Sequence, residues 1–400
     1  MCRTTAYYQH PDERLIAPVI YLDHAATTPV RREVFEAMKP YLTDEFGNPS
    51  GIHAFARTAR RALDDARERL AAVLGCEPGD LVFTSGGTEA DNLAVTGAAL
   101  HAIGEGAAAP LVCCSAVEHP AVLGPVTYLG GLELPVDRSG VIDVGMLRAV
   151  LDVEQDRVVL VSVMLANNET GVVEPVDEVA ALVHELVPGA LVHTDAVQAL
   201  AWLDIRTETA SADLVTVSAH KIGGPKGVGA LVARGGARER LSPIIRGGPQ
   251  ERELRAGTPN LPGIVGFATA AELADAERGD ATRRAGELGG RLLAGILSLV
   301  PGAVPAVQGA ERLASILNIG FPDVDSEELL LLLDQHGIAA SAGSACASGA
   351  IEPSPVLLAM GLTSAEVKCH VRFSLGSSTT ESEIDAAIKA VAQAVEHLRR

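Results

Sequence analysis

A lysine that follows an apolar run is the residue best placed to do covalent chemistry. Ser218-Ala219-His220-Lys221 comes directly after Leu214–Val217 and precedes a run of glycines. An amine at the end of a buried strand loses part of its hydration, so it can lose its proton at neutral pH and form a Schiff base with a carbonyl. A surface turn whose lysine only extends into solvent is the alternative.

A carboxylate closes the preceding strand-like run. Asp195 ends the stretch that begins at Leu191, 26 residues before Lys221. Two consecutive strand ends therefore offer a carboxylate and an amine. Pyridoxal phosphate needs such a pair, because one group forms the Schiff base and an acid keeps the pyridine nitrogen protonated, so that the ring can accept electrons. Taken alone, Asp195 would more often cap a helix.

A glycine-containing turn supplies a third part of such a site. Thr84-Ser85-Gly86-Gly87-Thr88-Glu89 follows a strand-like run and opens a helical one. Backbone N–H groups, a hydroxyl and a helix N-terminus together favour a phosphate. A tight turn with Thr88 as an ordinary helix cap is the alternative. The turn, Asp195 and Lys221 taken together favour pyridoxal phosphate as the cofactor.

One cysteine stands among small residues. Positions 341–349 read Ser-Ala-Gly-Ser-Ala-Cys-Ala-Ser-Gly, with the thiol at Cys346. Small neighbours give a nucleophilic thiol mobility and access, whereas a structural cysteine is usually buried and inert. A loop with an incidental cysteine is the alternative. We interpret the other five as structural: Cys2, Cys76, Cys113, Cys114 and Cys369.

The scaffold that must position these residues is predicted from the alternation of short apolar runs with helical patterns. β-rich runs at 81–84, 111–114, 158–163, 191–194, 214–217 and 230–233 alternate with helical segments such as 53–74. This rhythm is typical of a largely parallel sheet with helical crossovers. We predict an α/β fold with an N-terminal extension over 1–20 and a large domain over 21–262. Segment 21–50 is a candidate to pack on a smaller domain.

The smaller domain is predicted for residues 263–400. A helical pattern over 264–299, with a glycine-containing break near 286–290, is interpreted as a connector. Beyond it the pattern is α+β, with strands at 316–319 and 371–375, a helix at 326–335, a small-residue loop at 339–350 and a final helix from Thr380. The loop at 339–350 carries Cys346.

Composition argues against several classes of function. The chain has 400 residues, with 32 Lys and Arg against 51 Asp and Glu, which gives a net charge of −19. This surplus opposes binding to nucleic acid or to an anionic membrane, so neither partner is expected. No stretch reaches about 18 uninterrupted apolar residues, and the first residues lack the pattern of a secretory signal. The six cysteines resemble neither a disulfide framework nor a zinc site. We expect a soluble, cytoplasmic protein with reduced thiols and no metal centre.

The motifs together resemble the class V aminotransferase family of fold-type I pyridoxal-phosphate enzymes, and within it the cysteine desulfurases of the iron–sulfur-cluster and nitrogen-fixation type. The resemblance runs from about Tyr21 to the C-terminal helix. Besides the motifs above, it rests on Asp23-His24-Ala25-Ala26-Thr27-Thr28, Gly47-Asn48-Pro49-Ser50, Glu118-His119, Asn167-Asn168-Glu169-Thr170-Gly171, Arg255-Ala256-Gly257-Thr258 and Arg372-Phe373-Ser374-Leu375-Gly376. Ala56, Pro355 and Ser377 depart from the family pattern and are compatible with a different sulfur acceptor.

The resemblance implies a role for each matching residue. Lys221 would hold the cofactor, Asp195 would pair with the pyridine nitrogen, and His119 would stack on the ring. Arg372 would bind the substrate carboxylate through its planar guanidinium, together with Asn168. Thr258 would reach the phosphate of a neighbouring subunit, which implies a homodimer. The remaining cofactor contacts would be Asn168 and Gln198 on the phenolic oxygen side, and Gly87, Thr88, Ser218 and His220 at the phosphate.

The implied activity is the removal of sulfur from L-cysteine. The Cys346 thiolate, with His119 as proton acceptor, would attack the substrate sulfur, which leaves L-alanine and a Cys346 persulfide for transfer to a protein acceptor. Alternatives with the same fold are a selenocysteine lyase, a C–S lyase acting on a larger thioether and an aminotransferase, and Cys346 argues against them. A non-catalytic sulfur carrier is the alternative from another class, and Lys221, Asp195 and Arg372 argue against it.

Overall fold

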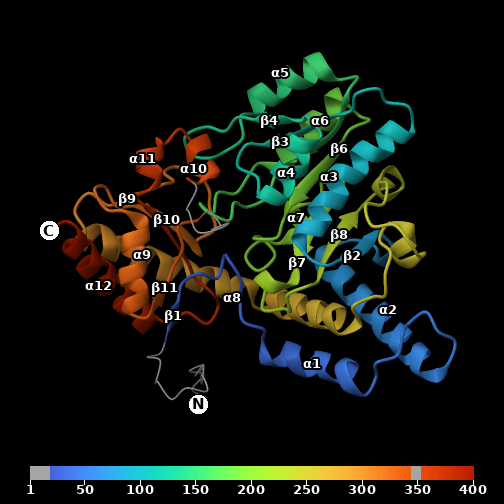
Figure 1. Cartoon of the computed structure of the whole chain (residues 1–400), viewed down its shortest axis with the longest axis horizontal. Coiled ribbons are helices and arrows are strands. Elements are labelled where there is room, and N and C mark those ends of the chain that lie inside the picture. Colours follow the sequence, from blue (N-terminus) through green and yellow to red (C-terminus); the bar gives the residue numbers. More distant parts are fainter. Residues whose placement is uncertain (1–18, 344–352) are drawn as a thin grey trace. The chain divides into compact units, whose positions relative to one another are not determined.

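The computed structural model describes residues 19–343 and 353–400, and the chain divides into two compact units (Figure 1). The large unit comprises Thr27–Asn167 and Val172–Asp280. The small unit comprises the described residues up to Ala26, the short segment Asn168–Gly171, and the described residues from Ala281 to Arg400. The two units part between Asp280 and Ala281, within helix α8 and not at its start.

The large unit is built on a seven-stranded sheet in the order β2-β8-β7-β6-β5-β3-β4. All neighbouring strands run parallel except the two pairs that include β8, which confirms the predicted mostly parallel sheet. The inner strands are buried along nearly their whole length and are rich in Val and Leu, as expected where helices cover both faces of a sheet. The strands are β2 (Leu81–Thr84), β3 (Leu111–Ser115), β4 (Leu132–Leu134), β5 (Val158–Ser162), β6 (Leu191–Asp195), β7 (Leu214–Ser218) and β8 (Gly229–Ala233).

Helix α3 (Gly87–Gly104) lies along this sheet against β5, β6, β7 and β8 (Figure 1). It is apolar on most sides, which is typical of a helix that is buried all round. Helix α2 (Ala54–Leu74) begins where the His53 side chain accepts the Ala56 N–H, and it ends at Gly75, whose left-handed conformation favours glycine. The other elements are α1 (Arg32–Thr43), α4 (Pro120–Tyr128), α5 (Val144–Glu154), α6 (Val176–Leu186), α7 (Ile205–Glu208) and four short 3₁₀ turns at Pro78–Asp80, Ala219–Lys221, Ala237–Arg240 and Gln250–Glu253.

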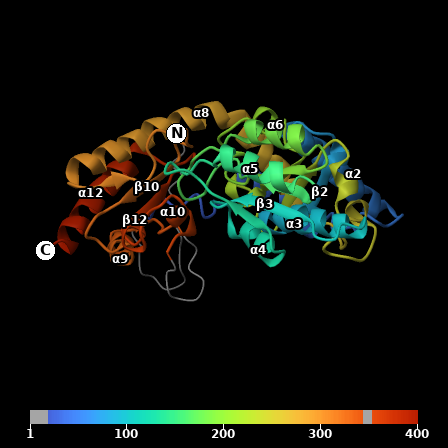
Figure 2. The same ribbon diagram turned by 90° about the horizontal axis from the view of Figure 1, so that it is seen from above.

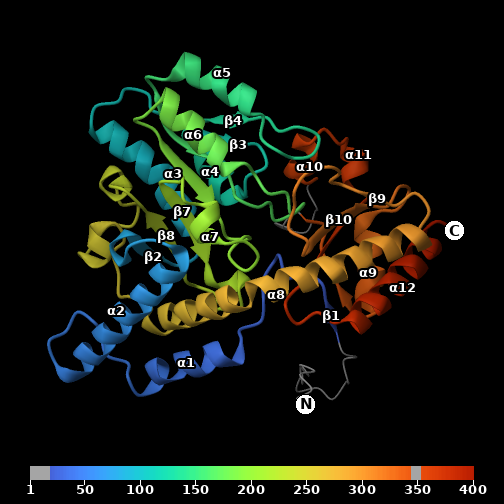
Figure 3. The ribbon, with the colours of Figure 1, turned by 180° about the vertical axis from the view of Figure 1, so that it is seen from behind.

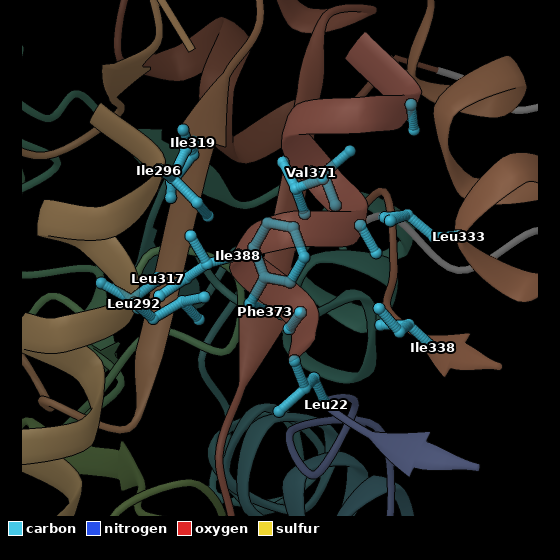
Figure 4. Packing of buried hydrophobic residues seen from close by; sticks show 14 of the residues in the cluster. Leu22, Leu292, Ile296, Leu317, Ile319, Leu333, Ile338, Val371, Phe373 and Ile388 are labelled. Atoms are coloured by element: carbon cyan, nitrogen blue, oxygen red, sulfur yellow. The ribbon is translucent and has the colours of Figure 1, made fainter. Parts of the chain in front are cut away.

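The small unit packs helices against a three-stranded antiparallel sheet in the order β12-β10-β9. Its core gathers side chains of α8, β10, β12 and α12, with Leu22 from the N-terminal segment (Figure 4). Leu22 directly follows β1, which pairs in parallel with β11. The elements are β1 (Ile20–Tyr21), β9 (Val304–Pro305), β10 (Ile316–Gly320), α9 (Ser326–Gln335), β11 (Ile338–Ala339), α10 (Pro355–Ala359), α11 (Ser364–Val367), β12 (His370–Ser374) and α12 (Glu381–Leu398).

Helix α8 runs from Leu261 to Leu299 as one element (Figures 2 and 3), so the predicted break near 286–290 is wrong. One glycine in this stretch, Gly289, serves packing. A Cβ atom on Gly289 would lie 2.5 Å from the carbonyl oxygen of Ala314, so glycine lets α8 approach that backbone closely. Within the described ranges, we find no helix that combines the length and the apolar character needed to cross a lipid bilayer.

Candidate functional site

Two neighbouring strand ends place a carboxylate and an amine at one edge of the large sheet. β6 ends at Asp195, which pairs in register with Thr216 of β7, and β7 continues through Ser218 into the 3₁₀ turn that carries Lys221. In open α/β sheets, ligands bind outside the carboxyl ends of the strands. His119 follows β3, whose carboxyl end lies at the same edge because β3, β5, β6 and β7 are parallel.

The charges of these three side chains influence one another. Burial raises the pKa of Asp195, while His119, the Val197 N–H at 2.8 Å and Lys221 each favour its charged form. Burial lowers the pKa of His119, and Lys221 lowers it further, while Asp195 opposes the shift. The structure therefore brings Asp195, His119 and Lys221 together. Asp195 caps no helix, since the next one begins only at Ile205.

The His119 ring has a defined orientation. Its Nδ1 accepts the N–H of Ala121 at 3.1 Å, which makes His119 the N-cap of α4. An Nδ1 that accepts a hydrogen bond leaves the proton of the neutral ring on Nε2. His119 therefore presents an N–H donor at Nε2, and it becomes a proton acceptor there only after that proton has been given away.

The glycine turn after β2 forms the beginning of α3. The helix begins at Gly87 with Gly86 as its N-cap, so Thr88 lies inside the first turn and is not the cap, contrary to the alternative considered above. A Cβ atom on Gly87 would lie 2.9 Å from Cγ2 of Val197, so a larger residue at this position would have to displace the Val197 side chain. The N-terminus of a helix offers unpaired backbone N–H groups to an anion.

A cavity of about 350 Å³ lies at this helix end. The buried Ser218 hydroxyl has no hydrogen-bond partner among the described residues, and its Cβ would be 3.8 Å from a Cβ on Gly87. A buried hydroxyl without a partner indicates a missing ligand, and here a phosphate oxygen would satisfy it. The residues present thus fit a phosphate. The cavity is lined by Thr27, Ser85, Gly86, Gly87, Thr88, Glu89, His220, Lys226 and Gly227.

Two threonines hold the turn that carries His220 and Lys221. Thr27 Oγ1 lies 3.1 Å from His220 Nδ1, and the Thr28 hydroxyl donates to the His220 carbonyl at 2.8 Å and accepts the Gly223 N–H at 2.8 Å. Burial, with the nearby charges of Lys221 and Lys226, lowers the pKa of His220 to about 4, so its ring is neutral at pH 7. Thr27 and Thr28 belong to a motif that carries the family resemblance, but neither was predicted to have a role in the site.

A layer of buried polar residues from β5, β6, β7, α3 and the segment after β3 surrounds Asp195, and the sequence did not predict it. Ser162 Oγ donates to Glu118 Oε1 at 3.1 Å and lies 2.8 Å from His193 Nδ1, while His193 Nε2 lies 3.0 Å from Thr216 Oγ1. Burial raises the pKa of Glu118 and of Asp91 well above the usual range, and the Asp195 charge adds to both shifts. Burial lowers the pKa of His193 to about 3. This layer favours neutral forms around the Asp195 carboxylate.

The predicted substrate-binding arginine lies in the small unit. Arg372 of β12 donates to Asp23 Oδ1 at 2.8 Å and to the Asn168 carbonyl at 2.9 Å. Its Nε is buried and has no acceptor among the described residues. A buried guanidinium N–H that lacks an acceptor fits a ligand carboxylate.

The predicted site residues are divided between the two units. Asn168 and Arg372 meet in the small unit, whereas the other described ones belong to the large unit. Gln198 is buried, and Thr258 is exposed after Gly257, whose φ of +113° favours glycine. Cys346 lies outside the described residues. Within the described part of the chain, no group of His, Cys, Asp and Glu side chains is arranged to hold a metal ion.

Comparisons with known protein families, sequences and structures agree on the family of this chain. The family described as aminotransferase class V matches residues 20–387. A cysteine desulfurase IscS of Methanosarcina thermophila is 41% identical over 95% of this chain and 93% of its own length. A cysteine desulfurase of Trichormus azollae is 44% identical over 95% and 94%. A solved NifS-like protein superposes with a TM-score of 0.87 at 34% identity, covering 95% of this chain and 100% of that protein.

Proposed function

Since the chain belongs to the aminotransferase class V family, we propose that it is a pyridoxal-phosphate-dependent cysteine desulfurase. The observation that carries the proposal is the meeting of Asp195, His119 and Lys221 at one sheet edge, beside a helix N-terminus and the unpartnered Ser218 hydroxyl. The relatives from Methanosarcina thermophila and Trichormus azollae are both cysteine desulfurases.

The cofactor would be held by residues of the large unit. Its phosphate would accept from the α3 N-terminus and Ser218, and Asp195 would pair with the pyridine nitrogen. When bound, pyridoxal phosphate supplies an electron sink that acidifies the substrate Cα–H and weakens the Cβ–S bond. The Lys221 amine would hold the cofactor covalently, and after release it would remove the Cα proton and return it.

The small unit would supply the substrate carboxylate site and the thiol. Arg372 Nε would donate to the carboxylate of L-cysteine, with its other nitrogens fixed by Asp23 and the Asn168 carbonyl. The Cys346 thiolate would attack the substrate sulfur. An S–S bond forms, the Cβ–S bond breaks with its electron pair going to carbon, and a proton completes L-alanine. One L-cysteine and one thiol thus give one L-alanine and one persulfide, without an external oxidant.

We propose a homodimer that passes sulfur to a protein acceptor. Five large apolar side chains between Phe35 and Phe55 are more than half exposed, which is unusual for a monomer surface. Thr258 is exposed, as reaching a neighbouring subunit requires. A cytoplasmic location suits the thiol, which has to be reduced between turnovers. The five side chains are Phe35, Leu42, Phe46, Ile52 and Phe55.

The test separates this proposal from its alternatives. The purified protein should be yellow, release L-alanine from L-cysteine and carry a persulfide on Cys346 by mass spectrometry. Cys346→Ser should lose both products yet retain the visible absorption band, whereas Lys221→Ala should lose the band. An aminotransferase would instead require an oxo acid and convert L-cysteine to 3-mercaptopyruvate, and a C–S lyase would leave pyruvate. Normal alanine formation by Cys346→Ser would refute the proposal, and so would a colourless protein that does not respond to added pyridoxal phosphate.

A further inference from the structure

The cavity at the N-terminus of α3, whose residues fit a phosphate, has an acidic side chain in its wall. Glu89 lines the cavity from the first turn of the helix, and its side chain is 10% exposed. A carboxylate that is largely removed from water repels a second negative charge strongly, because little solvent is left to screen the interaction. An anion site with such a neighbour therefore needs a group that compensates the charge.

Arg255 supplies the compensating charge. Its Nε donates to Glu89 Oε1 at 2.8 Å and its Nη2 donates to Oε2 at 3.3 Å, so the guanidinium lies against the carboxylate with two nitrogens. Burial raises the pKa of Glu89, but the hydrogen bonds from Arg255 and Ser85 outweigh it and hold the pKa below its usual range, so Glu89 is ionised at pH 7. The ion pair as a whole carries no net charge, and it would not repel a phosphate as Glu89 alone would.

The Glu89 carboxylate also shapes the turn that forms the cavity. Its Oε2 accepts the Ser85 N–H at 2.8 Å, and Ser85 lines the cavity as well. The contact joins the first turn of α3 to the residue that precedes its N-cap, Gly86. The carboxylate thus has a structural role that requires an acceptor at this place, and Arg255 removes the electrostatic cost of that acceptor.

The segment that carries Arg255 is held to the strand that leads into this turn. Glu251 Oε2 accepts the N–H of Phe83 at 3.0 Å, on β2 at the edge of the sheet, and Arg67 donates to both Glu251 oxygens at 2.6 and 2.8 Å. Residues 251–253 have φ values of 45°, 55° and 70°, a left-handed conformation that residues other than glycine rarely adopt. Such strain persists where surrounding contacts enforce it, and it is concentrated at functional sites. The segment is therefore fixed at both ends, through Glu251 and through Arg255.

We propose that Arg255 is a positioning residue of the phosphate site, because its guanidinium holds the Glu89 carboxylate in the wall of the cavity and neutralises a charge that would otherwise repel the phosphate. Arg255 does not itself line the cavity, so it acts through Glu89. The inference rests on the proposed function only in taking pyridoxal phosphate as the anion.

The test is the Kd of pyridoxal phosphate, measured by titrating the full-length apoprotein and recording the absorption band. Arg255→Gln removes the compensating charge. A double variant that adds Glu89→Gln removes both charges, while the glutamine oxygen can still accept the Ser85 N–H. The matched control is Arg69→Gln, since Arg69 donates through Nε and Nη2 to Glu272 in the same unit and neither residue lines the cavity.

Arg255→Gln should raise the Kd about tenfold or more, because an uncompensated carboxylate then faces the phosphate. The double variant should return to within about threefold of the parent, and Arg69→Gln should equal the parent. If Arg255 served the fold alone, or bound the phosphate directly, the double variant would bind as weakly as Arg255→Gln, and that result would overturn the proposal. A Kd for Arg255→Gln no higher than that of Arg69→Gln would also overturn it.

Melting temperatures of the apoproteins identify any variant that fails to fold. If Arg255→Gln fails, the single variant Glu89→Gln decides, because it leaves the Arg255 charge free to attract the phosphate. Tighter binding than in the parent then supports the proposal, and equal or weaker binding overturns it. Failure of the proposed desulfurase activity would appear separately, as normal alanine formation by Cys346→Ser, and it would leave the order of the Kd values intact. A parent apoprotein that forms no band would refute the cofactor and this inference together.

Discussion

Replacement of Arg372 should weaken the binding of L-cysteine by an amount that follows from its contacts. Two guanidinium nitrogens are already committed to Asp23 and to the Asn168 carbonyl, and the buried Nε has no acceptor among the described residues. A hydrogen bond to a charged group contributes roughly 1.5–3 kcal/mol, which is about a 10- to 150-fold change in affinity. We therefore expect Arg372→Gln to raise the KM for L-cysteine about 10- to 150-fold. Arg372→Lys, which keeps the charge but lacks an Nε–H, should lie between it and the parent.

The assay is the initial rate of L-alanine formation over a wide range of L-cysteine concentrations, with the absorption band recorded for each variant. A matched control is Arg312→Gln in the same unit, since Arg312 donates to the backbone carbonyls of Leu313 and Ile316 and tests the loss of a partly buried guanidinium away from the substrate. Asp23→Asn removes the charged partner of Arg372 and should raise the KM less than Arg372→Gln does.

Two results would contradict this role of Arg372. If the KM for L-cysteine rises no further in Arg372→Gln than in Arg312→Gln, the unpartnered Nε does not bind the substrate. If Arg372→Gln instead lowers kcat and leaves the KM unchanged, under conditions in which the chemical step is slower than the dissociation of L-cysteine, Arg372 does not bind the carboxylate of the bound substrate before the reaction.

Three further predictions concern the large unit. Ser218→Ala should weaken the binding of pyridoxal phosphate to the apoprotein roughly tenfold or more, since a hydrogen bond from the hydroxyl to the charged phosphate is lost, and it should not destabilise the apoprotein. Titration of the apoprotein with pyridoxal phosphate, followed by the absorption band, measures the Kd, and an unchanged Kd would contradict the prediction. Burial raises the pKa of Glu174 to about 8, so its contribution to stability is complete below the unfolded-state pKa near 4.5 and is lost as the pH rises towards 8, by up to about 1.4 kcal/mol per pH unit. Glu174→Gln should remove this slope in urea unfolding between pH 5 and 8, and equal slopes in the two proteins would contradict it. Glu253 has a φ of +70°, so Glu253→Gly should stabilise the protein by about 1 kcal/mol and Glu253→Ala should not; equal melting temperatures for the two variants would count against backbone strain.

Local patterns predicted the scaffold well because its elements carry their own signals. The β6 and β7 strands each begin with a buried Leu-Val pair and end in a polar residue, and the structure ends them within a residue of the predicted position. Thr380 begins the last helix through a capping box with Glu383, a signal contained within four residues. Helix α8 was interrupted in the prediction because a glycine that ends a helix and a glycine that packs closely against another segment look alike in sequence.

The site was predicted in part, since its members differ in how local their signals are. Asp195, Ser218 and Lys221 stand where apolar runs end, so the strand pattern identified them. The layer formed by Glu118, Ser162 and His193 lies inside such runs or next to them, where a polar residue is easily taken for ordinary packing. Residues that meet across 185 positions, as Glu169 and Ser354 do, leave no local pattern at all.

The distribution of roles between the two units has a consequence that single variants can test. The residues that would hold the cofactor at its phosphate and its aldehyde carbon, Ser218, His220 and Lys221, belong to the large unit, whereas Arg372, which would bind the substrate carboxylate, belongs to the small one. Variants of the first group should therefore change the affinity for pyridoxal phosphate and the absorption band. Arg372→Gln should change the KM for L-cysteine while the band stays the same. An altered band in Arg372→Gln before L-cysteine is added would show that the two roles are not separable, and that Arg372 acts on the cofactor itself.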